Sequence, residues 1–115
     1  MSSDFGREPA VAPCPAADRL PAGLESYRRT PEFTEADVPA GLLRDHSTKA
    51  GVWGLIQVRG GRLRYKVTDP RRLPSERLLT AEAAPGVVEP GIVHQVAPDG
   101  AVRFHVQFFR EPKPD

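Results

Sequence analysis

The sequence has little cysteine, no long apolar run and almost no excess of charge. Cys14 is the one cysteine in 115 residues, so a disulfide or a multi-cysteine zinc site within the chain is excluded. No apolar stretch approaches the ~18 residues of a membrane span, and residues 1–4 lack the start of a signal peptide. The net charge of +1 is far from the basic stripe of a nucleic-acid-binding protein. We therefore expect a soluble, cytoplasmic protein with neither a membrane nor a nucleic-acid partner.

Proline and glycine are abundant instead, with 13 and 10 residues. Proline lacks an amide hydrogen and clashes with the preceding helical turn, so this density favours short extended segments joined by turns. The length allows one domain. Because the two ends combine proline, alanine and charge without an apolar period, we expect a disordered leader over residues 1–19 and a tail over 111–115. The folded domain is then expected over residues 20–110.

Glycine-containing turns predict two β-hairpins within this domain. Glycine supplies the positive φ that tight hairpin turns require. The last apolar segment also alternates, with apolar even-numbered residues against Arg103, His105 and Gln107, as in a strand with one dry face. Together these patterns predict an all-β sandwich or barrel. The predicted hairpins pair 52–58 with 63–67 around Gly60-Gly61, and 92–97 with 102–109 around 98–100.

The histidines are the main candidates for chemistry. There are three of them, His46, His94 and His105, and a closed barrel would bring their distant strands to one mouth. Neutral imidazole is the commonest ligand for transition metals, and a carboxylate such as Glu89 would complete a mixed nitrogen and oxygen set. The alternative for each histidine is a half-buried residue with one hydrogen bond. The alternative for Glu89, which precedes Pro90, is a turn carboxylate paired with an arginine.

Basic side chains offer a second kind of site. Lys49 and Arg64 could hold an anion, and Arg103 and Gln107 share a polar strand face that could contribute. A solvated surface role is the commoner fate of such charges. The sequence has no Gly-x-Ser-x-Gly elbow, and Gly60-Gly61 does not open a helix as a phosphate-binding loop would. Neither an activated nucleophile nor a nucleotide site is therefore predicted.

Several segments carry a family resemblance that covers about residues 20–110. The most specific is the run Asp45-His46-Ser47-Thr48-Lys49. Its neighbours are residues 20–24, 27–33 and 43–54, followed by 85–90 with His94 and by 102–106. Together they resemble the small cupin-like domain of tellurite-resistance proteins of the TehB and YeaR type. In that family the domain occurs alone or ahead of a methyltransferase domain, and methyl transfer is not carried over to a chain of this length.

The resemblance implies a cupin-like double-stranded β-barrel, one of the jelly-roll class. It also implies a role in tolerance of tellurite or related oxyanion and oxidative stress. His46 and His94 match two of the four usual cupin ligands, whereas Thr48 stands at the second histidine position and 53–54 at the glutamate position. Ordinary dioxygenase or isomerase chemistry is therefore not implied.

Our leading sequence-based hypothesis is a metal-binding protein. A divalent metal, zinc above iron or nickel, would be held by His46, His94 and His105, with Glu89 as fourth ligand or as support for one. The alternative is a metal-free module that binds or senses a small anion through basic side chains. The predicted partner in both is a small molecule or oxyanion, and the pair Phe108 and Phe109 suggests a homodimer contact.

Overall fold

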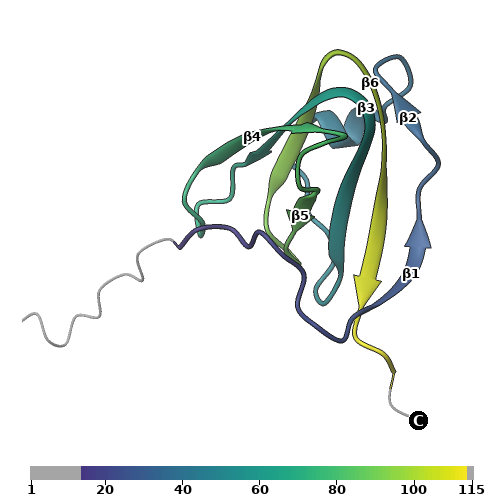
Figure 1. Cartoon of the computed structure of the whole chain (residues 1–115). Coiled ribbons are helices and arrows are strands. Elements are labelled where there is room, and N and C mark those ends of the chain that lie inside the picture. Colours follow the sequence, from purple (N-terminus) through teal and green to yellow (C-terminus); the bar gives the residue numbers. More distant parts are fainter. Residues whose placement is uncertain (1–13, 114–115) are drawn as a thin grey trace, which may run out of the picture.

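Two long strands carry the architecture of residues 14–113, the part of the chain that the computed structural model describes (Figure 1). They are β3 (Trp53–Val67) and β6 (His94–Arg110). The remaining elements are β1 (Glu25–Arg29), β2 (Phe33–Thr34), the 3-10 helix η1 (Ala40–Leu43), β4 (Ser75–Thr80) and β5 (Gly86–Val88). The protein is therefore all-β, as predicted. No helix in this part of the chain is long and apolar enough to cross a membrane.

Strands β3 and β6 pair antiparallel with each other from end to end. Trp53 lies opposite Phe109 at one end of the ladder, and Val67 lies opposite His94 at the other. Both strands bend together at the top of the view in Figure 1. The register of their pairing shifts on either side of Gly60-Gly61. The two predicted hairpins are therefore wrong, because their glycines lie within continuous strands. Glycine at positive φ serves a β-bulge as well as a turn, and here the bulges bend a long ribbon.

Shorter strands extend this ribbon into a six-stranded sheet with the order β1-β6-β3-β4. Strand β2 adds to β6, and β5 adds to β3. Within the described residues β1 and β4 end the path and do not pair with each other, so the sheet stays open. The predicted cupin-like double-stranded barrel is corrected accordingly. The bend of β3 and β6, rather than a closed ring of strands, folds the sheet over its core.

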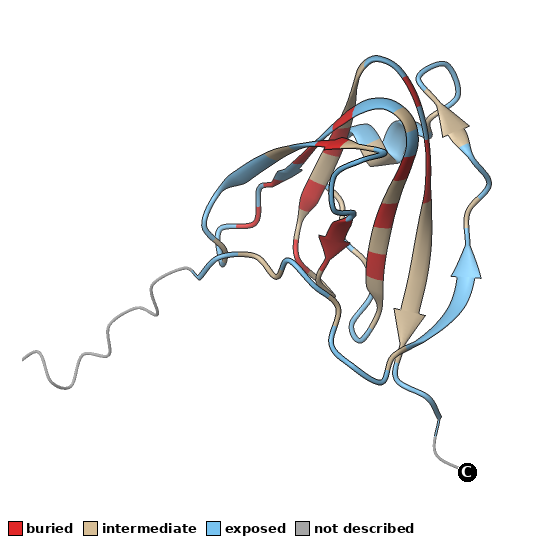
Figure 2. Cartoon of the chain, in the orientation of Figure 1, coloured by how far each residue is buried: buried red, intermediate tan, exposed pale blue. Residues whose placement is uncertain are grey.

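The core lies on the inner face of the bent sheet (Figure 2). The alternation along the second half of β3 is confirmed, since Leu63, Tyr65 and Val67 are buried between exposed basic residues. On β6 the alternation is confirmed only over residues 101–104, where Val102 and Phe104 are buried, because His105 is buried as well and residues 106–109 are all half-buried. The largest fully buried side chains come from four different strands: Leu63 from β3, Leu79 from β4, Val88 from β5 and Phe104 from β6. Burial of this apolar surface holds the two halves of the sheet together.

The predicted leader falls partly outside the described residues, which begin at Cys14. Residues 1–13 and 114–115 are not described, so the leader and tail boundaries stay predictions. The described part of the leader contacts the domain, because Cys14 forms a β-bridge with Arg72 and its carbonyl accepts a hydrogen bond from the Leu73 amide at 2.9 Å.

Candidate functional site

A cavity of about 520 Å³ lies against the inner face of the sheet. Its floor is apolar and comes from β3, β5 and β6, with η1 and the segments beside it adding further wall. Its polar side chains come mainly from residues 46–49, between η1 and β3. The apolar floor residues include Ile56, Val88, Val96, Phe104, Val106 and Phe108. A cavity of this size and character is typical of small-molecule sites.

Two of the predicted residues, His46 and His94, meet in this cavity, and we call them the histidine pair. Their backbones form a reciprocal bridge, in which the His46 amide donates to the His94 carbonyl at 2.9 Å and the His94 amide returns the bond at 2.8 Å. Their rings lie 4.1 Å apart between centroids. The run Asp45-His46-Ser47-Thr48-Lys49, which we call the DHSTK run, is thus attached through its backbone to the first residue of β6.

Each ring of the histidine pair is oriented by a nearby backbone carbonyl. Nδ1 of His46 lies 2.8 Å from the Arg44 oxygen, and Nδ1 of His94 lies 3.0 Å from the Ile92 oxygen. A neutral imidazole that donates through Nδ1 has Nε2 as its acceptor. Within residues 14–113 neither Nε2 has a hydrogen-bond partner. When both rings are neutral, the pair therefore has two Nε2 acceptors that are free of partners in this part of the chain.

Burial keeps His94 neutral at physiological pH. Loss of solvation is the main cause and lowers the pKa of His94 from its usual 6.5 to about 4. The hydrogen bond to the Ile92 carbonyl opposes this in part, and the neighbouring His46 adds a smaller lowering. Only 4% of the residue is exposed, and Tyr65 covers it edge-on at 5.7 Å between ring centroids. His94 is therefore a hydrogen-bond acceptor at pH 7 and not a cation.

Positive charge enters the cavity from Arg28 of β1 and from Lys49, which we call the cationic rim. Both residues are exposed, so they stand where the cavity meets solvent. Neither is in an ion pair within the described residues, and no carboxylate is among the residues that line the cavity. Ser47 adds a hydroxyl beside Lys49. The site is thus electrostatically suited to a negatively charged ligand.

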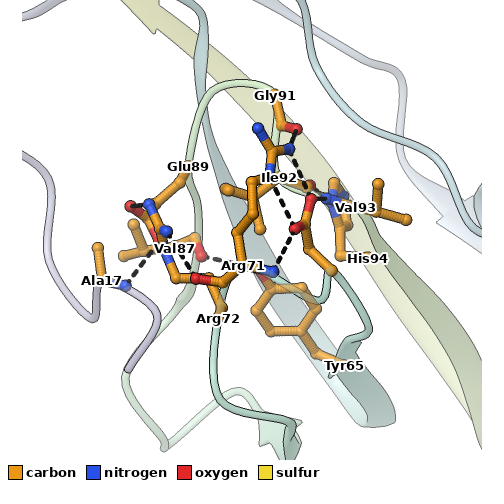
Figure 3. A network of polar contacts seen from close by, with 11 residues as sticks. Ala17, Tyr65, Arg71, Arg72, Val87, Glu89, Gly91, Ile92, Val93 and His94 are labelled. Atoms are coloured by element: carbon orange, nitrogen blue, oxygen red, sulfur yellow. Dashed lines mark hydrogen bonds and ion pairs between the residues drawn. The ribbon is translucent and has the colours of Figure 1, made fainter. Parts of the chain in front are cut away.

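The predicted metal site does not form. Glu89 is held by Arg72, whose Nε and Nη2 donate to its two oxygens at 2.9 and 3.0 Å, and by the Ala17 amide at 3.0 Å (Figure 3). Arg72 accordingly holds the pKa of Glu89 below its usual range. His105 lies on β6 at an odd-numbered position, whereas the cavity is lined by even-numbered neighbours such as Phe104 and Val106. No group of three or more histidine, cysteine or acidic residues able to hold a metal exists among the described residues.

The alternation of side chains along β6 explains why His105 is separated from the histidine pair. Successive strand residues face opposite sides of a sheet, so an odd and an even position on β6 cannot share one face. Burial lowers the pKa of His105, with Arg29 and Arg59 as further causes. His105 is therefore an isolated buried histidine on the other face.

Of the predicted anion-binding residues, Lys49 alone lines the cavity. The other three carry side-chain partners of their own away from the cavity, so their ligand-binding role stays a prediction. Their partners are Glu76 for Arg64 at 3.1 Å, Glu32 for Arg103 at 3.5 Å and Gln57 for Gln107 at 2.7 Å. The homodimer contact also stays a prediction, although Phe108 lines the cavity.

Sequence reasoning missed Arg28 and the buried carboxylate of Asp69. Arg28 lies in the segment 27–33 that shares in the family resemblance, but β1 has no apolar alternation that would place its side chain at a site. Asp69 accepts a hydrogen bond from Arg71 at 2.7 Å and another from the Val93 amide at 2.9 Å, which ties the loop after β3 to the start of β6. These bonds hold the pKa of Asp69 well below its usual range. Figure 3 shows Arg71 and Val93 beside the Arg72–Glu89 pair.

The open all-β sheet and its small-molecule-sized cavity define a small β-domain with one candidate ligand site. The chain belongs to the TehB-like domain family, whose model matches residues 28–106. It is 32% identical over 74 residues to the probable S-adenosyl-L-methionine-dependent methyltransferase TehB of Haemophilus influenzae strain Rd, covering 64% of this chain and 26% of that protein. The same protein of strain 10810 is 31% identical over the same share. The chain thus spans about a quarter of the length of these relatives.

Solved structures agree with this family. The crystal structure of TehB from Haemophilus influenzae superposes with a TM-score of 0.71 at 26% identity, covering 78% of this chain and 32% of that one. A crystal structure from Escherichia coli K12 also gives 0.71, at 24% identity, and covers 83% of this chain and 98% of that one. This second likeness shows the fold alone.

These findings correct the cofactor and the cupin description. The family resemblance to TehB is confirmed, but the curated relatives are named as S-adenosyl-L-methionine-dependent enzymes. The predicted divalent metal, whether zinc, iron or nickel, is therefore wrong. The cavity does not fit S-adenosyl-L-methionine either, because its cationic rim would face a sulfonium and no carboxylate for the ribose hydroxyls is among its described lining residues.

Proposed function

We propose that this chain is a metal-free binding module for a small anion, acting in a TehB-type response to tellurite or a related oxyanion. The observation that carries the proposal is the charge of the cavity: two cations enter it, and no carboxylate is among its described lining residues. The family membership supports the link to tellurite, which rests on the resemblance of the DHSTK run. The predicted cytoplasmic location is consistent with such a role and stays a prediction.

The cationic rim would hold the anion through charge-assisted hydrogen bonds. Such bonds contribute roughly 1.5–3 kcal/mol each, more than neutral ones. Arg28 and Lys49 lie on segments far apart in sequence, so the fold rather than local spacing brings them to one cavity. Ser47, beside Lys49, would add a neutral donor.

The histidine pair would recognise a protonated oxygen of the same ligand. Its Nε2 atoms are acceptors when the rings are neutral, and His94 is neutral at pH 7 for the reason given above. A hydrogen oxyanion carries both an anionic oxygen and a hydroxyl. It would therefore satisfy the cationic rim and the histidine pair together.

Lys49→Met tests the rim directly. We expect the affinity for tellurite, selenite or phosphate to fall at least about tenfold, since one charge-assisted bond contributes roughly 1.5–3 kcal/mol and each ~1.4 kcal/mol is tenfold in affinity. Isothermal titration in the presence of a chelator would measure the dissociation constants, and the melting temperature should rise with each anion that binds the native state. Lys66→Met is the matched control, because Lys66 is an exposed lysine on β3 outside the cavity.

Two results would contradict the proposal. The first is that the unmodified protein binds none of the three anions in chelator. The second is that Lys66→Met or Arg64→Ala weakens binding as much as Lys49→Met, since the anion would then lie on the outer face where Arg64 pairs with Glu76.

A further inference from the structure

We propose that the natural ligand is an organic anion with an apolar body, rather than a bare inorganic oxyanion. The inference rests on the anion-binding function proposed above and names the ligand class. One water molecule occupies about 30 Å³ in the liquid. A bare oxyanion of four or five heavy atoms replaces a few such molecules and so fills on the order of 100 Å³. The cavity measures about 520 Å³, so an inorganic anion at the rim leaves most of it unfilled.

The unfilled part is apolar and has few polar groups able to retain water. Its floor includes Val88, Val96 and Val106, and two of the polar lining residues, Thr30 and Thr48, already have hydrogen-bond partners in the protein. Thr48 Oγ donates to the Val52 carbonyl at 2.7 Å, and Thr30 Oγ accepts from the Val106 amide at 3.0 Å. Buried water needs two to four polar partners, so this region favours hydrocarbon over solvent.

Aromatic side chains form much of this apolar lining. Phe33, Phe104 and Phe108 line the cavity, and Phe33 meets Phe104 edge-to-face at 5.7 Å between ring centroids. Tyr27 lines it as well and is held in place from β6, because the Arg110 guanidinium lies 4.1 Å from its ring centroid. These rings give a rigid wall of large apolar area at low cost in side-chain entropy.

The charged and the apolar parts of the cavity lining therefore recognise different parts of one molecule. The cationic rim, Arg28 and Lys49, binds the anionic head at the solvent side. The apolar floor removes the body from water, and burial of each methylene contributes about 0.8 kcal/mol. This asymmetry assigns the site to an amphipathic organic acid.

A homologous series of carboxylates tests the inference with the full chain. Acetate, butyrate, hexanoate and octanoate carry the same head and differ only in methylenes, and benzoate adds a planar body. We expect affinity, measured by titration calorimetry in chelator, to rise about two- to fourfold per methylene until the cavity is filled. Hexanol, which has the body without the charge, should bind at least about tenfold more weakly than hexanoate.

A variant that partly fills the cavity tests whether the apolar body of the ligand binds there. Val106→Phe adds bulk at the lining, so octanoate should lose at least about tenfold in affinity while acetate is little changed. Leu55→Phe is the matched control, because Leu55 is a half-buried β3 residue outside the lining. Melting curves check both variants, and if Val106→Phe does not fold, the series on the unmodified chain still decides.

The outcomes separate this inference from the function on which it rests. Affinity that rises with chain length and falls in Val106→Phe supports it. Flat affinity across the carboxylates, with inorganic oxyanions bound as tightly, overturns the inference and leaves the anion-binding module standing. Equal binding of hexanol and hexanoate, or no binding of any anion, overturns the anion-binding function itself.

Discussion

At the residue scale, burial gives His94 a protonation behaviour that its place in the sequence does not indicate. The side chain lies beneath Tyr65 and against His46, where a charged imidazole would lose hydration and meet a second ring. Its pKa falls to about 4 for this reason. A histidine that looked like a metal ligand is thus a neutral acceptor in the cavity wall.

This shift predicts how stability depends on pH. Between pH 6.5 and about 4 the unfolded chain binds a proton at His94 that the native state does not. The free energy of unfolding should therefore decrease as pH falls through this window, by roughly 3 kcal/mol in total from this residue. Chemical denaturation at pH 7 and pH 4.5 would measure the slope.

His94→Gln should flatten that pH slope, whatever its effect on stability at one pH. His105→Gln is the comparison: burial also lowers the pKa of His105, so its loss should remove only its own part of the slope and leave the His94 contribution in place. An equal slope in the native chain and in His94→Gln would contradict the assignment of the buried proton site to His94.

At the element scale, the bend shared by β3 and β6 decides the shape of the molecule. Gly61 takes φ of 75° at this bend, and a Cβ built there would lie 1.9 Å from the Ala101 carbonyl oxygen. Only glycine permits both the conformation and the close approach of the two strands. The bend therefore depends on one residue whose side chain is a hydrogen.

Gly61→Ala should destabilise the protein by at least about 2 kcal/mol, because positive φ strain adds to a backbone clash. Gly100→Ala is the matched control: Gly100 has φ of 81°, but a Cβ there meets nothing within 4 Å. It should cost about 1 kcal/mol from the conformation alone. Denaturant unfolding would compare the two, and equal losses would show that the close contact at Gly61 does not matter.

The strands themselves were more predictable than their pairing. Alternation identified the buried face of residues 63–67 and of residues 102–104, because period two is a local property of an extended chain. The hairpins were wrong for a non-local reason. Gly60-Gly61 would suit a turn equally well, but β6 lies alongside the whole of β3 and offers hydrogen bonds past the glycines.

The candidate site was predictable in part. The run around His46 and Lys49 was identified from the sequence, and both residues line the cavity. The separation of His105 and the pairing of Glu89 with Arg72 were not, because each depends on strand register or on a contact 17 residues away along the chain. Arg28 came only from the tertiary structure.

At the scale of the whole molecule, Glu89 connects the N-terminal segment to the sheet. It joins Arg72, in the loop before β4, to the Ala17 amide of the segment before β1 (Figure 3). Cys14 pairs with the same Arg72 through the backbone. A carboxylate predicted to support a metal thus holds three separate stretches of chain together.

Glu89→Gln should loosen this junction. The Ala17 amide loses a charged acceptor, so its hydrogen exchange should speed up about tenfold or more, in line with a charge-assisted bond of roughly 1.5–3 kcal/mol. Exchange measured by NMR at single amides would test it. Glu76→Gln, which removes the exposed partner of Arg64, is the control and should leave Ala17 unchanged. Unchanged exchange in Glu89→Gln would contradict the role given to Glu89.

The sequence by itself determined the all-β class, the inward faces of the strands and the segment that carries His46 and Lys49. These follow from proline density, period-two alternation and a local motif, all of which act over a few residues. The tertiary structure alone decided that β3 and β6 bend together without turning back. It also decided that the histidine pair lines a cavity with an apolar floor and with no carboxylate among its described lining residues. Strand partnership and charge pairing depend on residues distant in sequence, and only the packed sheet brings those residues together.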